Sequence, residues 1–100
     1  MITGDKKAKL TKLLNPLTGS VPISGAAIRY NVVTHTFTIP NARVGDVVSL
    51  GITPTLYNPN LLYYGYVSAP DTLTIVVRDL SADIHVYNGS VSYVITPVLA

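Results

Sequence analysis

The chain has 100 residues, of which 48% are hydrophobic and only 12% are charged, and it contains neither Glu nor Cys. This length fits one domain with one core, and the lack of Cys excludes disulfides and thiolate metal sites. No apolar run approaches the roughly 20 residues that span a bilayer, and residues 1–12 lack the apolar core of a signal peptide. We therefore expect a soluble protein that buries part of its apolar surface against partners.

The charges are divided unevenly along the chain. Residues 1–12 carry four Lys and one Asp, a net charge of +3, whereas residues 13–100 carry three Arg and four Asp, a net charge of −1. So small and localised an excess argues against nucleic-acid binding by the rest of the chain. A nearly uncharged body behind a cationic arm is what a small subunit needs to hold a much larger partner.

The first 17 residues contain leucines at helical spacing. Those at i, i+3, i+4 and i+7 are Leu10, Leu13, Leu14 and Leu17. Asp5 is a candidate N-cap and Pro16 a stop for a short helix. The segment is either a solvated basic tail or an arm that docks on a neighbour. In the second case the apolar anchors are Leu10, Leu13 and Leu14, and the electrostatic guides are Lys6, Lys7, Lys9 and Lys12.

Residues 15–27 (NPLTGSVPISGAA) are rich in Pro, Gly and Ser. Such a composition predicts an extended linker without regular structure. The chain is therefore expected to have two parts, a basic arm with its linker over residues 1–26 and a compact body over residues 27–100.

From residue 28 onward the hydrophobic period is two, which indicates β-strands. We expect strands over residues 28–32, 34–39, 47–52, 63–68, 72–77, 84–87 and 91–98. Asn88-Gly89 predicts a hairpin between the last two, because a type I′ turn needs positive φ at both central residues. Pro97 indicates an edge strand or the exit from one. Short strands at this spacing predict an all-β fold, a small antiparallel β-sandwich of jelly-roll-like type with an extended N-terminal arm.

Residues 37–48 (FTIPNARVGDVV) resemble a strand–turn–strand signature of small structural proteins of tailed-phage virions. Residues 66–75 (YVSAPDTLTI), followed by residues 79–81, resemble its second half. The resemblance spans about residues 36–98 and departs from the signature at Asn41, where Gly is usual, and at Asp79, where Asn is usual. It implies a β-sandwich domain on the head surface or in the fibres of a virion, often assembled as a trimer.

Titratable side chains offer little for catalysis. The four Asp residues of the body fall at predicted turns, and for Asp46 and Asp71 the turn role is favoured because Asp bonds nearby backbone N–H groups. A chance pair of Asp83 with His85 is a weak acid–base candidate. Two separated histidines give no metal-ligand spacing, and no Gly-rich loop leads into a helix to hold phosphate. We expect no enzyme activity, no metal and no cofactor.

Tyrosine is the enriched aromatic residue, and several tyrosines cluster around residues 58–60. The candidate interface residues are Tyr57, Tyr63, Tyr64 and Tyr66. Three roles stay open for them, namely core and rim packing, a subunit interface, and binding of a sugar or receptor.

These features predict a non-enzymatic virion protein on the capsid surface. In the main hypothesis a trimer decorates the head, and its arms bind the major capsid protein and stabilise the shell. The first alternative is a receptor- or glycan-binding domain of a head or tail fibre. The second is a small capsid-forming subunit whose basic arm faces the genome.

Overall fold

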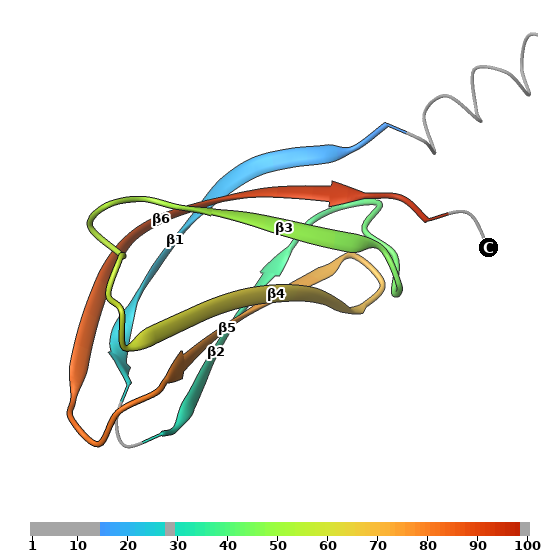
Figure 1. Ribbon diagram of the computed structural model, residues 1–100. Coiled ribbons are helices and arrows are strands. Elements are labelled where there is room, and N and C mark those ends of the chain that lie inside the picture. The colour runs from blue at the N-terminus through green and yellow to red at the C-terminus, as the bar shows by residue number, and fades with distance from the viewer. Residues whose placement is uncertain (1–14, 28–29, 99–100) are drawn as a thin grey trace, which may run out of the picture.

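The computed structural model describes residues 15–27 and 30–98 (Figure 1). Its six strands are β1 (Leu17–Ala27), β2 (Val32–Thr38), β3 (Val47–Ile52), β4 (Leu61–Ala69), β5 (Thr72–Asp79) and β6 (His85–Thr96). They form two antiparallel three-stranded sheets, sheet A in the order β1-β6-β3 and sheet B in the order β2-β5-β4. The all-β prediction is confirmed for this part of the chain, which also holds no helix that could cross a membrane.

The predicted arm lies largely outside the described residues. This applies to the candidate helix and to all seven candidate arm residues, Lys6, Lys7, Lys9, Leu10, Lys12, Leu13 and Leu14. Their roles stay predictions. The described chain begins at Asn15, two residues before β1.

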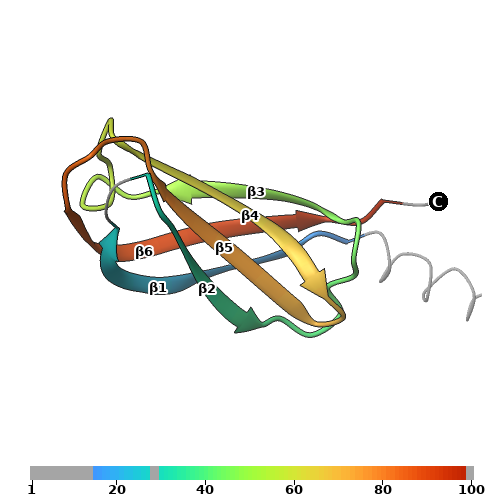
Figure 2. The same ribbon diagram turned by 90° about the horizontal axis from the view of Figure 1, so that it is seen from below.

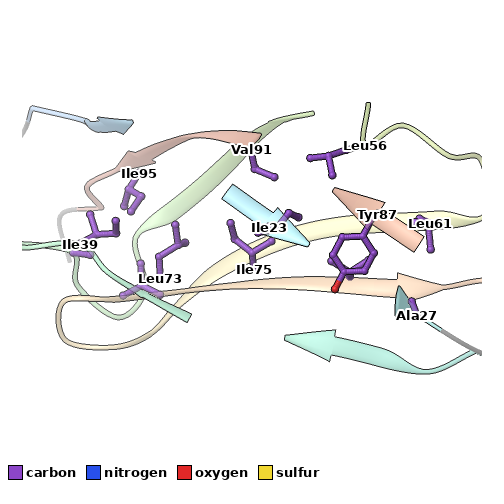
Figure 3. Packing of buried hydrophobic residues seen from close by; sticks show 13 residues of the cluster. Ile23, Ala27, Ile39, Leu56, Leu61, Leu73, Ile75, Tyr87, Val91 and Ile95 are labelled. Carbon is purple, nitrogen blue, oxygen red and sulfur yellow. The ribbon is translucent and has the colours of Figure 1, made fainter. Parts of the chain in front are cut away.

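The two sheets face each other across one core (Figure 2). In β1 and β6 the buried and half-buried residues fall on every second position, whereas in β5 residues 73–77 are all buried. Ile75, Val91 and Ile95 are fully buried, and Figure 3 shows how such side chains point into the space between the ribbons. Burying one aliphatic side chain of this size contributes about 1.5–3 kcal/mol. In β5 even the outward Thr74 and Val76 are buried, as expected for the central strand of sheet B.

The prediction that residues 15–27 lack regular structure is wrong. Residues 17–27 form β1, an edge strand that pairs with β6 along its whole length. Gly19 and Gly25 face the core and lie opposite Tyr93 and Tyr87, whose rings occupy the space above them. A Cβ built on Gly25 would stand 2.8 Å from the Tyr87 hydroxyl oxygen. Tyrosines of the partner strand therefore cover the glycines, and β1 belongs to the body although the predicted boundary at residue 27 excluded it.

The hairpin predicted at Asn88-Gly89 is also wrong. Both residues lie inside β6, the unbroken central strand of sheet A, and neither has positive φ. Glycine is needed at position 89 because residues 53–56 pass close to it. A Cβ on Gly89 would lie 2.6 Å from Thr55 Oγ1 and 2.8 Å from Leu56 Cγ. Pro97 directly follows β6, so it marks the exit from a strand.

We predict that Gly89→Ala lowers the free energy of unfolding by about 1–3 kcal/mol, because the added methyl group must displace the buried Leu56. Ser90→Ala is the matched control. Its exposed side chain points outward from the same strand, and the expected change is within about 0.5 kcal/mol. Urea unfolding followed by circular dichroism measures both values. Equal stability of the two variants would contradict the close packing at Gly89.

Candidate functional site

An open, mostly apolar groove of about 450 Å³ is lined by residues of the β3–β4 connection, the start of β4 and the loop after β5. These connections lie at left in Figure 1. The residues that line the groove are Ile52, Tyr57, Asn58, Pro59, Leu61, Leu62, Tyr63 and Leu80. None of these side chains is charged. Volume and lining both fall within the range of ligand and peptide sites in proteins.

Backbone hydrogen bonds hold the walls of this groove. Leu56 N donates to Thr53 O (2.9 Å), and Leu61 N donates to Asn58 O (3.0 Å), so the β3–β4 connection consists of two tight turns. Leu80 N donates to the carbonyl oxygen of Asn60 (2.8 Å). This bond fixes the loop after β5 against the second turn, so the two walls are joined.

The structure separates the four candidate tyrosines. Tyr63 points inward, and its hydroxyl donates to Leu56 O (2.6 Å). Burial raises the pKa of Tyr63, and interaction with Tyr87 raises it further. Tyr57 lies on the groove with 73% of its surface exposed. Tyr64 and Tyr66 are about half-exposed on the outer face of sheet B. The groove therefore includes Tyr57 and Tyr63 but not Tyr64 and Tyr66.

A buried carboxylate lies next to the groove. Asp79 is fully buried and accepts hydrogen bonds from His85 Nδ1 (3.0 Å), Ser81 N (2.8 Å) and Ser81 Oγ (3.0 Å). Burial on its own raises the pKa of Asp79, but the bonds from His85 and Ser81 and the charge of His85 outweigh it, so the pKa lies below its ordinary value. His85 therefore pairs with Asp79, and the predicted Asp83–His85 pair is wrong.

This cluster braces the loop between β5 and β6. Ser81 contacts Asp79 and lies on the Nδ1 side of His85, at 3.4 Å. In a Ser–His–Asp triad the hydroxyl bonds the ring nitrogen that faces away from the carboxylate. Here Nε2 instead lies 3.5 Å from Asn60 Nδ2. The short sequence Asp79-Leu80-Ser81 could have predicted a turn bond, because an Asp side chain commonly accepts from the residue two positions later.

A second polar contact joins the two sheets inside the core. His35 of β2 and Tyr87 of β6 share a hydrogen bond between Nε2 and the hydroxyl (2.6 Å), with the rings edge to face. Burial lowers the pKa of His35 and raises that of Tyr87. His35 is therefore neutral in the folded protein at pH 7.

The outward faces of both sheets are almost free of charge. In sheet A the outward side chains are the even-numbered residues of β1 and β6 and residues 47, 49 and 51 of β3, and none of them is Asp, Lys or Arg. In sheet B the outward side chains are the even-numbered residues of β2, β4 and β5, and Arg78 is the one charge among them. Ser, Thr, Val and Tyr make up most of both faces.

Within the described residues no group of three or more His, Asp, Glu or Cys side chains is placed to hold a metal ion. Comparisons with protein-family models, curated proteins and solved structures found no match. The groove, the Asp79 cluster and the uncharged faces are thus the features from which a function must be argued.

We predict that the protein loses stability as the pH falls through 6.5. The pKa of His35 is lower in the folded chain than the ordinary value of 6.5, so below that pH the unfolded chain binds the proton more readily. The contribution of neutral His35 is complete above pH 6.5 and decreases below it. Urea midpoints at pH 8 and pH 5.5 measure the loss. In His35→Gln this difference should shrink, and an unchanged difference would show that other groups cause it.

Asp79→Ala should lower the melting temperature clearly more than Asp83→Ala. The first change leaves the partly buried donors of His85 and Ser81 without an acceptor, whereas Asp83 is exposed. Differential scanning calorimetry at pH 7 compares the two. Similar decreases in melting temperature in both variants would mean that the hydrogen bonds of Asp79 contribute no more to stability than the exposed Asp83 does.

Proposed function

We propose that this protein is a non-enzymatic structural protein of a phage virion, which lies on the capsid surface and strengthens the shell by binding the major capsid protein. The observation that carries the proposal is the near absence of charge on the outward faces of the two sheets. Surfaces of independent small domains are usually rich in charged residues, whereas the cores of protein interfaces are depleted in them. Removing water from a face of Ser, Thr and Val costs less free energy than removing it from a face of unpaired charges.

We further propose that the two sheets form a β-sandwich of jelly-roll-like type. The first strand pairs with the last (β1 with β6) and the second with the fifth (β2 with β5). The third and fourth strands then join the other edges of β6 and β5. A long antiparallel hairpin that folds over into two packed sheets produces this strand order. Its two faces point in opposite directions, so one subunit can contact two neighbours at once, as a shell-strengthening protein must.

The resemblance to phage virion proteins supports the same proposal, because its two halves meet in space. Ile39 N donates to Asp71 O (2.8 Å), and Asp71 N donates to Ala42 O (2.9 Å). The Asp71 side chain also accepts from Asn41 N (2.8 Å). Asn41 has a φ of 75°, a conformation that Gly adopts freely and Asn more readily than most residues. Asn in the usual Gly position therefore preserves the turn.

A receptor- or glycan-binding domain of a fibre is the second candidate. Tyr64 and Tyr66 point outward from β4, and the exposed Thr36 of β2 lies on the same face of sheet B. Aromatic rings beside hydroxyl groups suit a neutral, hydroxyl-rich ligand. In this alternative the outward face of sheet B would bind the ligand. In the first proposal the outward face of sheet A binds the capsid, because it carries no charged side chain.

We expect the purified protein to co-sediment with capsids of the phage that encodes it, assembled without it. Ser90→Asp with Ser92→Asp places two charges in the middle of the outer face of sheet A. It should weaken binding by about tenfold or more, because these charges lose water without gaining a partner.

The matched control is Val44→Asp with Ala82→Asp, which adds the same charge at exposed loop positions and should bind normally. Tyr64→Ala with Tyr66→Ala should also bind normally. Loss of host attachment in the tyrosine variant, with capsid binding intact in the serine variant, would favour the fibre role. Failure of the unmodified protein to bind such capsids would overturn the proposal.

A further inference from the structure

We propose that the apolar groove binds the leucines of residues 10–14 from a second copy of this chain, so that copies join arm to groove. This inference concerns how copies assemble with one another. It goes beyond capsid binding, and it is tested without capsids.

The groove exposes four large apolar or aromatic side chains. Tyr57, Leu62, Leu80 and Ile52 are 73%, 46%, 49% and 37% exposed, and all of them line it. No charged side chain interrupts the lining. Contiguous apolar surface rimmed by polar residues is typical of a protein-binding site, and the absence of charge selects an apolar occupant.

The arm carries a matching pattern. Leu10, Leu13 and Leu14 stand at i, i+3 and i+4, the spacing with which an amphipathic helix places anchors in an apolar groove. Lys12 falls on the opposite side of such a helix, at 100° per residue, and can stay in water. The segment lies outside the described residues, and it joins the body at Asn15.

The position of β1 favours the groove of another copy over that of the same chain. Leu17 of β1 pairs with Ile95 of β6, which pairs with Val48 of β3. Ile52, the groove residue on β3, pairs with Val91 of β6, which pairs with Val21 of β1. Four residues along a strand and two strands across separate the two points by about 16 Å. Leu13 and Leu14 precede Leu17 by only four and three residues, a reach of at most about 14 Å when fully extended. A helical segment reaches less.

In our proposal the arm therefore enters the groove of another copy. Such a contact joins two different surfaces, so repeating it gives a ring if the rotation closes and a filament if it does not. A closed ring is the assembly we propose, because it satisfies every arm and every groove.

The test uses full-length chains in sedimentation velocity. Leu10→Ser with Leu13→Ser and Leu14→Ser disables the arm, and Leu62→Ser with Leu80→Ser disables the groove. The unmodified protein should form a closed oligomer, and each variant alone should be monomeric, with association weakened at least about tenfold. An equal mixture of the two variants should form a heterodimer, because one intact arm then meets one intact groove.

The matched control is Ile84→Ser with Val86→Ser, which removes two side chains that are 64% and 78% exposed outside the groove. It should assemble like the unmodified protein. A monomeric unmodified protein, an arm variant that still assembles, or a mixture that stays monomeric would overturn the proposal. Circular dichroism confirms that each variant is folded, and the substituted groove residues are already half-exposed.

The lack of native Cys allows a direct check of the contact. Leu13→Cys and Leu80→Cys on separate chains should form a disulfide only when mixed. When both changes are placed in one chain, oxidation should give covalent multimers. A monomer cross-linked within itself would show that the arm folds back on its own groove, and the proposed exchange between copies would be wrong.

Discussion

The contacts of Tyr87 across the two sheets are the interaction on which the rest of the structure depends. Its ring comes from the central strand of sheet A, is 2% exposed and covers Gly25 of β1. Its hydroxyl bonds His35 of β2, and its edge packs against Tyr63 of β4. The Tyr63 hydroxyl in turn donates a hydrogen bond to the carbonyl oxygen of Leu56. Leu56 lies in the β3–β4 connection, which forms one wall of the groove. One aromatic side chain thus connects the edge strand, the second sheet and the candidate binding site.

The same contacts explain why parts of the fold could be predicted from the sequence and others could not. Alternation in residues 72–77 predicted β5 because its inward positions, Leu73, Ile75 and Val77, are all apolar and buried. In β1 half of the inward positions are Gly or Ala, and the partners of the two glycines are tyrosines more than sixty residues away. Local composition then indicates a linker, although the inward Leu17, Val21 and Ile23 already show a period of two.

Asn88-Gly89 failed as a turn signal for a related reason. Its glycine meets a steric demand set by Leu56, which is distant in sequence, and a turn signal reports only local backbone preference. Of the candidate site, the tyrosine cluster could be found from composition. The division of that cluster between core, groove and outer face could not, because it depends on the register of β4 against β5. The pairing of His85 with Asp79 likewise depends on how the loop after β5 turns back.

Pairing of the first strand with the last gives the body two unlike ends. Leu17 pairs with Ile95, so the chain enters and leaves the sheets at one end, whereas Ala27 pairs with His85 at the other. The Asp79 cluster and the groove lie at this second end. His85 donates a hydrogen bond to Asp79, and Leu80 of the groove donates one to the carbonyl oxygen of Asn60. We propose that a molecule whose β1 begins at one end and whose apolar groove lies toward the other joins its copies head to tail. This leaves the uncharged sheet faces available for a larger partner.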